Sequence, residues 1–331
     1  MFWLIAALCF DQPSAVGAVV TPSRPVSTFS IVARDPKTGE MGVAVQSHWF
    51  SVGSIVTWGE AGVGVVATQS FVEPAYGQRG LDLMKTGMSA PDALGKLLAD
   101  DPQREVRQVA MLDAQGRVAA HTGKQAIAAA GHQIGTQYST QANMMANDKV
   151  WPAMAAAFQR GQGDLADRLL ASLDAAQAVG GDIRGKQSAA ILVVRPKTTG
   201  RPWQDADRVF DLRVEDHPEP LKELRRLIVL QRAYTHANRG DELMSAKKID
   251  EALKEYAAAR ALAPQIQELP FWVAVTLVSV GRETEAAPIF REVFAKEPQW
   301  VALVSRLPAA GLLPNDQALI ARILKLGPPP R

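Results

Sequence analysis

The sequence predicts an α+β domain over residues 28–216, followed by an all-α domain over residues 217–331. From residue 28 to about residue 194, the apolar pattern switches between the periods of strands and helices, which indicates both in one domain. Strand patterns come as hairpins and helical patterns as pairs, which favours antiparallel sheets with helices stacked outside. Beyond residue 217 the strand pattern stops and a helical repeat begins.

The α+β domain opens on a predicted hairpin over residues 28–47. "TFSIVAR" and "MGVAVQS" alternate in polarity on either side of "DPKTGE", where Pro36 and Gly39 are turn residues. Residues 53–70, "GSIVTWGEAGVGVVATQS", are predicted to form a second strand pair, because glycine and β-branched residues suit strands packed on both faces.

The rest of this domain repeats the same order. Two helices are predicted over residues 76–86 and 89–101, the second with Ser89 as N-cap and Pro91 in its first turn. Further expected elements are a hairpin turning at Gln115-Gly116, one strand in residues 132–145, helices at 150–160 and 164–179, and a strand at 188–194.

The C-terminal region contains an internal repeat. Glu251, Ala252, Tyr256 and Pro264 recur 34 residues later as Glu285, Ala286, Phe290 and Pro298. This offset and these residue types resemble the tetratricopeptide (TPR) repeat, whose helix pairs stack to bury a shared face. The helix from about residue 220 and the segment 315–326 are expected to cap the stack.

Composition and motifs exclude several functions. The formal net charge is +2 without a basic run, which gives no indication of a nucleic-acid partner. The sequence has no P-loop, HExxH or GxSxG motif and no histidine pair at metal-ligand spacing. "GVGVVA" at residues 62–67 is followed neither by a helical pattern nor by the acidic residue that ribose binding needs. We therefore expect no metal and no cofactor.

Residues 1–18 resemble a secretory signal peptide. The apolar run "MFWLIAALCF" contains Cys9, the only cysteine, and is too short to span a bilayer, while Val16 and Ala18 suit a cleavage site. The expected location is periplasmic or extracellular, with residues 19–27 as a propeptide or linker. A mis-assigned start codon, and hence a cytoplasmic protein, is the alternative.

Several blocks together suggest a family. Residues 28–69, "YGQRGLDL", "QANMM" and "GGDIRGKQSAAILVV" closely resemble the family of unknown function numbered 1028, which is placed within the Ntn-hydrolase superfamily. The resemblance covers about residues 28–216. It implies a four-layer αββα sandwich, and it implies no particular substrate.

The superfamily mechanism implies a role for Thr28. In Ntn hydrolases the first residue of the mature chain is the nucleophile, and its α-amine, whose pKa is near 8, acts as the general base. Family members resemble this chain from Thr28 onward, which makes Thr28 the candidate, with Ser27 and Ser30 as runners-up. The mechanism requires cleavage between Ser27 and Thr28. If that bond stays intact, Thr28 only opens a strand, and the domain is an inactive small-molecule or partner-binding module.

Other candidate site residues follow from the chemistry of their side chains. No lysine suits the role of the basic residue near the nucleophile, because Lys37 lies in a turn and Lys85 in a helix. Glu60 has an apolar, aromatic setting in which a carboxylate is costly to bury, although it can equally be a turn residue in water. Asn143 is a candidate oxyanion donor. Candidate substrate-binding residues are Ser30, Ser47, His48, Asp182, Arg184 and Gln187.

Together with the signal-like segment, the resemblance implies an exported Ntn-type amidohydrolase that acts on an unknown amide or peptide substrate. The TPR-like region would bind a protein partner or support oligomerisation, including a homodimer.

Overall fold

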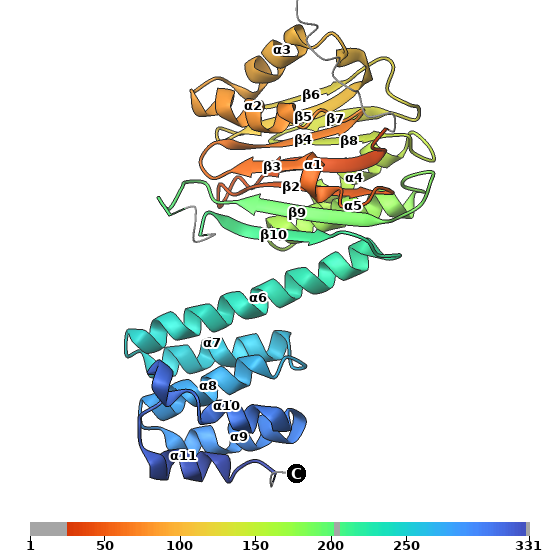
Figure 1. The fold of residues 1–331 in the computed structure, drawn as a ribbon. Helices are drawn as coiled ribbons and strands as arrows, with labels where there is room; N and C mark the ends of the chain where they lie inside the picture. Colours follow the sequence, from red (N-terminus) through yellow and green to blue (C-terminus); the bar gives the residue numbers. More distant parts are fainter. Residues whose placement is uncertain (1–24, 202–205, 329–331) are drawn as a thin grey trace, which may run out of the picture.

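The computed structural model describes residues 25–201 and 206–328. It contains a layered part with two sheets and a helical part, and the long helix α6 (Pro220–Ser245) connects them (Figure 1). The mixed α+β character of the first part and the all-helical character of the second are confirmed. The signal-peptide prediction for residues 1–18 lies outside the described residues.

The larger sheet has six strands in the order β10-β9-β2-β1-β8-β7, all antiparallel to their neighbours. Strand β1 therefore lies inside the sheet, and its hairpin with β2 is the one that the sequence predicts. The strands are β1 (Thr28–Arg34), β2 (Met41–Ser47), β7 (Gly131–Gly135), β8 (Tyr138–Asn143), β9 (Ser188–Val194) and β10 (Arg208–Val214).

The smaller sheet has four antiparallel strands in sequence order, and it faces the larger sheet (Figure 1). The predicted turn at Gln115-Gly116 is confirmed, with Gly116 at a φ of +80°. The strands are β3 (Thr57–Glu60), β4 (Gly64–Ser70), β5 (Arg107–Asp113) and β6 (Val118–Thr122).

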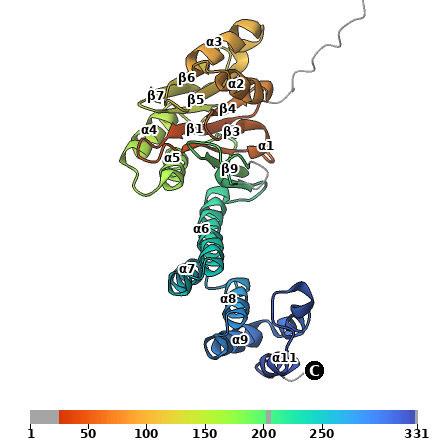
Figure 2. The same cartoon turned by 90° about the vertical axis from the view of Figure 1, so that its left-hand side faces the viewer.

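Two helix pairs cover the outer faces of the sheets. Helices α2 (Ala75–Lys85) and α3 (Ala90–Asp100) pack on the smaller sheet, and α4 (Val150–Arg160) and α5 (Leu165–Ala178) pack on the larger one (Figures 1 and 2). Ser89 caps α3 as predicted, since its hydroxyl accepts a hydrogen bond from the Asp92 amide at 3.1 Å. The order of layers is therefore helix pair, sheet, sheet, helix pair.

Two predictions from the sequence were incomplete. Residues Gly53–Val56 form a short helix, α1, before β3, so the second predicted strand pair begins later than expected. The single strand predicted in residues 132–145 is two strands, β7 and β8, which turn at Gln137 with a φ of +61°. A left-handed turn without glycine gives no clear turn signal in the sequence.

The space between the sheets changes character along the strands. Buried valines fill its centre, among them Val32, Val43, Val45 and Val65. Towards the end of the sandwich where β1 begins, the inward-facing residues are serine, threonine, asparagine and glutamine instead. This polar end contains the candidate site.

In the helical part, two helices of equal length recur at a fixed spacing. Helix α7 covers Ile249–Leu262 and α9 covers Glu283–Lys296, so both bounds differ by the same 34 residues as the sequence repeat. Helix α6 belongs to both parts, because Leu221, Leu224 and Ile228 join the core of the larger sheet. The remaining helices are α8 (Glu268–Ser279), α10 (Val301–Val304) and α11 (Gln317–Leu324).

Candidate functional site

Thr28 is the first residue of β1, and it is completely buried. It pairs in register with Ser47 of β2 on one side and with Asn143 of β8 on the other. Side chains paired across antiparallel strands lie on the same face of the sheet. Thr28, Ser47 and Asn143 therefore meet on the inner face of the larger sheet.

The carbonyl oxygen of Ser27, which belongs to the peptide bond before Thr28, is held by two side chains. The hydroxyl of Ser47 donates a short hydrogen bond to it, and Nη2 of Arg184 donates another at 3.2 Å. The hydroxyl of Thr28 donates to the carbonyl oxygen of Val26 at 2.9 Å and lies 3.4 Å from Oγ of Ser47. Hydrogen-bond donors thus converge on the carbonyl oxygen next to the Thr28 hydroxyl.

Arg184 is held in place by Asp182, whose side chain is fully buried. The guanidinium donates from Nε to Oδ1 at 3.2 Å and from Nη2 to Oδ2 at 3.0 Å. The carboxylate also accepts hydrogen bonds from the main-chain amides of His48 at 3.0 Å and Arg184 at 2.9 Å. Such two-point pairing fixes the plane of a guanidinium, so Arg184 is aimed at Ser27 before any ligand binds.

Glutamine side chains connect the two sheets behind Thr28. Gln69 Nε2 donates to the carbonyl oxygen of Thr28 at 3.3 Å and to Gln108 Oε1 at 2.6 Å. Asn143 Nδ2 also donates to Gln108 Oε1, at 3.0 Å. Ser30 donates to Gln69 Oε1 at 2.6 Å and accepts from Gln141 Nε2 at 2.7 Å. A buried amide is costly without partners, so this network fixes Asn143 beside Thr28.

Three buried polar atoms at this end have no hydrogen-bond partner among the described residues. They are Oδ1 of Asn143, Oγ of Ser70 and, on the outer face of the larger sheet, Oε1 of Gln46. Ser70 ends β4 and forms an isolated antiparallel bridge with Val26. Unpaired buried acceptors are rare in folded proteins, and they suggest a ligand or a group that is released or added later.

Backbone strain is concentrated at the same end. Among the described residues, five that are not glycine have positive φ, and three of them, Ser51, Ser70 and Met144, lie in or beside the loops at the Thr28 end. Left-handed backbone costs a residue with a side chain about 1–2 kcal/mol. Such strain is commonly found at functional sites.

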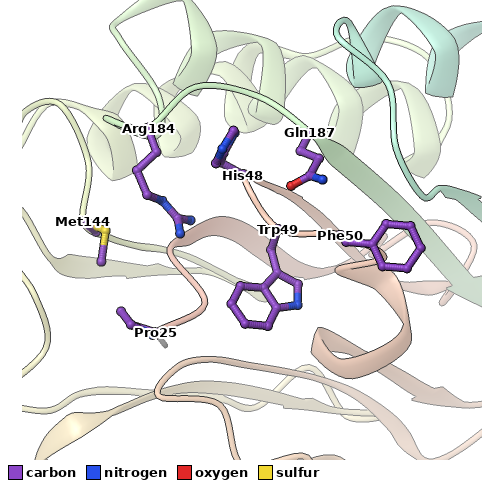
Figure 3. Close-up of a pocket in the computed structure, with 7 residues that line it drawn as sticks. All are labelled: Pro25, His48, Trp49, Phe50, Met144, Arg184 and Gln187. Atoms are coloured by element: carbon purple, nitrogen blue, oxygen red, sulfur yellow. The ribbon is translucent and has the colours of Figure 1, made fainter. Parts of the chain in front are cut away.

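A pocket of 550 Å³ opens beside the segment that leads into β1 (Figure 3). In this view Arg184, His48 and Gln187 lie along its upper rim and Pro25 lies at the bottom. Its lining is mostly apolar, and Phe50 at its edge is 64% exposed. The lining residues are Pro25, His48, Trp49, Phe50, Met144, Arg184 and Gln187.

A histidine lies behind the glutamine network. Thr122 Oγ1 accepts a hydrogen bond from Gln108 Nε2 at 2.9 Å and lies 2.8 Å from His132 Nδ1. Burial lowers the pKa of His132, and His121 lowers it further. The Thr122 hydroxyl thus connects Gln108 to the His132 ring, and in the tautomer whose Nδ1 is unprotonated it donates to that nitrogen.

Most of the predicted site residues come together in the structure. Ser47, Asn143, Asp182 and Arg184 surround the Ser27–Thr28 bond, and the side chains of His48 and Gln187 line the pocket. Ser30 is buried in the network, without access to the pocket. Sequence analysis missed Ser70, Gln69, Gln108 and Gln141. The three glutamines are polar residues at inward positions of apolar strands, whereas Ser70 follows Gln69 at the alternate position of β4 and gives no such signal.

Glu60 is the exception. It ends β3 beside the turn to β4, where Gly64 is its partner, whereas Ser70 at the other end of β4 pairs with Val26. With about 3.3 Å per strand residue, this places Glu60 roughly 20 Å from the Thr28 end. It forms an ion pair with Lys85 on the surface, so the prediction that groups Glu60 with Thr28 is corrected.

The described residues contain neither a metal-binding cluster nor a membrane span. Within residues 25–201 and 206–328, no cluster of three or more histidine, cysteine or acidic side chains could bind a metal ion. In the same residues, no helix is long and apolar enough to cross a membrane.

Comparison with known proteins identifies the family. Residues 28–224 match the family described as "Family of unknown function (DUF1028)". The chain belongs to DUF1028. A DUF1028 protein of Silicibacter pomeroyi, known from a crystal structure, is 31% identical with a TM-score of 0.54, and the match covers 61% of this chain and 87% of that chain. No curated protein matches the chain.

The DUF1028 match begins at Thr28 and ends inside α6. It includes Ser47, Asn143, Asp182 and Arg184, and it leaves out the residues before Thr28 and most of the helical part. Membership of DUF1028 gives the chain a family and no activity.

Proposed function

We propose that this protein is an N-terminal-nucleophile amide hydrolase in which Thr28 is the nucleophile. One observation carries the proposal: Ser47 Oγ and Arg184 Nη2 both donate to the carbonyl oxygen of Ser27, next to the hydroxyl of Thr28. Donors fixed around a carbonyl oxygen stabilise the negative charge that develops when its carbon is attacked. The same donors serve an amide substrate once residues 25–27 are gone.

The first step of this proposal is cleavage of the chain by itself. The Thr28 hydroxyl adds to the carbonyl carbon of Ser27, the bond from that carbon to the Thr28 nitrogen breaks, and the hydroxyl proton ends on the freed nitrogen. The Ser27 carbonyl then forms an ester with Oγ1 of Thr28. A water molecule hydrolyses the ester, which releases a carboxylate at Ser27 and restores the Thr28 hydroxyl. No oxidant, metal or cofactor takes part.

The freed amine then serves as base in turnover. It accepts the hydroxyl proton as Thr28 attacks a substrate carbonyl, and it returns the proton to the leaving amine. The unpartnered Oδ1 of Asn143 is the acceptor proposed for this amine, since Asn143 is the register partner of Thr28. In this proposal Asn143 orients the amine, because its Nδ2 is already engaged with Gln108.

A second candidate function is a binding module without catalysis. One observation favours it: Val26 and Ser27, the two residues before Thr28, are completely buried. In this case the pocket beside Pro25 binds a small molecule or a partner, and Thr28 only begins β1. The two functions differ in whether the Ser27–Thr28 bond is cut.

Substitution of Thr28 tests the proposal. Thr28→Ala should lower amide hydrolysis by about 10³-fold or more, because it removes the nucleophile. Thr28→Ser keeps a hydroxyl and should retain measurable activity and label with an acylating probe at residue 28. Thr38→Ala, in the exposed turn at the other end of the sandwich, is the matched control and should behave like the wild type. Unchanged hydrolysis or labelling in Thr28→Ala would contradict the proposal.

We also propose a setting for this activity. Export directed by residues 1–18 would leave residues 19–27 as a short propeptide. Stacked helix pairs of the TPR type in the helical part would bind a protein partner or a second copy of the chain. Support comes from the 34-residue offset between α7 and α9 and from the buried pair Tyr256 and Phe290 at matching positions.

A further inference from the structure

The residues before Thr28 lie in the site as a short extended peptide. The Val26 amide donates to the carbonyl oxygen of Ser70 at 2.6 Å, and the Ser70 amide donates to that of Val26 at 3.1 Å. The pairing of β3 with β4 ends at Thr57 and Ala67, so Val26 occupies an edge of β4 that β3 leaves open. An open strand edge can bind any extended peptide through the same main-chain groups.

The side chains of this segment are also accommodated. Val26 is completely buried in the apolar cluster that contains Val52 and Val72. Ser27 is completely buried too, and its hydroxyl donates to the carbonyl oxygen of Asn143 at 3.0 Å. The site thus has, in order, a space for a branched aliphatic side chain, a space for a small one, and donors for the carbonyl that follows.

We infer that the acyl part of the substrate is an extended peptide that takes the place of residues 25–27. Its last residue is small, and the residue before it is a branched aliphatic such as valine. The inference rests on the proposed function, because the substrate carbonyl takes the position of the Ser27 carbonyl once Thr28 is free. The segment before Thr28 is then an internal imitation of the substrate, and it occupies the site until it is cut.

A small amide without a peptide chain fits this site poorly. It can use the donors from Ser47 and Arg184, but it leaves the main-chain groups of Ser70 unpaired and the space of Val26 empty. Buried main-chain groups without partners are strongly disfavoured. The pocket beside Pro25 continues from the segment and has room for residues further from the cleaved bond.

Binding in a chain that keeps the segment tests the site without catalysis. In a full-length Thr28→Ala background, Val26→Gly removes the side chain that anchors the segment. Calorimetry with acetyl-Pro-Val-Ser, which ends in a carboxylate, should show at least tenfold tighter binding to the double variant than to Thr28→Ala alone. Acetyl-Pro-Asp-Ser should bind the double variant at least tenfold more weakly, since its carboxylate would enter an apolar space. Equal binding of both peptides, or of neither, would overturn the inference.

Hydrolysis by the wild-type protein separates this inference from the proposed function. The 4-nitroanilide of acetyl-Pro-Val-Ser should be cleaved with a kcat/KM at least 100-fold above that of the Asp-containing peptide. Hydrolysis that needs Thr28 but does not distinguish the two peptides would overturn the inference and leave the proposed function standing. Selective binding without any hydrolysis would overturn the proposed function and leave the peptide site standing.

Discussion

The two ends of the sandwich are built from the same strands and differ in almost every other respect. At the end away from Thr28, three turns have glycine at positive φ, namely Gly39, Gly62 and Gly116, and one has Gln137 in that conformation. The buried Asp113 there caps helix α3 by accepting from the Ala90 amide at 2.9 Å. At the Thr28 end, left-handed backbone falls on Ser51, Ser70 and Met144, and buried acceptors lack partners.

The features at one end stabilise the fold, and those at the Thr28 end form the candidate site. Glycine turns and helix caps stabilise the fold at one end, and each agrees with a rule for local structure. At the other end the chain tolerates strain and unpaired polar atoms, which cost stability. Departures of this kind are expected at functional sites, where side chains are held in the arrangement that function needs even though this lowers stability.

Among these substitutions, removal of Arg184 should have the largest effect on activity. Arg184→Ala takes away one donor to the Ser27 carbonyl and should slow cleavage of the Ser27–Thr28 bond and amide hydrolysis by about 100-fold. It also leaves the buried Asp182 carboxylate without its guanidinium, which should lower the free energy of unfolding by about 2 kcal/mol. Chemical denaturation and a time course of cleavage by mass spectrometry measure the two effects.

The matched control for Arg184→Ala is Glu60→Gln at the opposite end. Its ion pair with Lys85 is exposed, so we expect a change in the free energy of unfolding of at most about 0.5 kcal/mol. Cleavage and hydrolysis should be unchanged. Equal losses of activity in both variants would show that the two ends do not differ in function.

Protonation of His132, which lies behind the glutamine network, should lower the stability of the fold. Its pKa is lowered in the folded chain, mainly by burial, so the folded state binds this proton less readily than the unfolded state. The contribution of neutral His132 is therefore complete above the unfolded pKa of about 6.5 and is lost as the pH falls below it. His132→Asn keeps an acceptor for Thr122, and thermal unfolding from pH 7.5 to 5 should show a smaller loss of stability than the wild type. Identical pH dependence in both proteins would contradict this.

Relief of the strain at Ser70 should produce a small gain in stability and a clear change in function. Ser70→Gly removes left-handed strain and a buried hydroxyl without a partner, which should raise the free energy of unfolding by about 0.5–1 kcal/mol. Cleavage before Thr28 should become slower, because a glycine holds the main-chain groups that pair with Val26 less firmly than a serine does. Lys247→Gly, also at positive φ but in the helical part, should relieve strain without affecting cleavage. Faster cleavage in Ser70→Gly would contradict this account.

Much of the fold could be predicted because it depends on local signals. The β1–β2 hairpin has a glycine turn between alternating segments, and Ser89 is followed three residues later by the amide that it caps. The β7–β8 hairpin was missed because Gln137 makes its left-handed turn where glycine would be expected. Turns and caps with the expected residue types were therefore predicted, and the turn with an unexpected residue was not.

The site could be predicted only in part, because it depends on register between distant strands. Thr28, Asn143 and Arg184 were candidates from the sequence, yet the sequence does not show that Arg184 reaches Ser27 across 157 positions. Gln69 and Gln108 meet only because β4 and β5 align them as register partners. Glu60 was misplaced for the same reason. Its partner Gly64 and the site residue Ser70 belong to the same strand, β4, but lie at opposite ends of it.

The intact mass of the purified protein tests the central claim most directly. We expect the wild-type chain to begin at Thr28, and the Thr28→Ala chain, expressed in the same way, to retain residues before position 28. A wild-type chain that hydrolyses amides while residues before Thr28 remain attached would contradict the account, because its α-amine would then lie elsewhere in the chain.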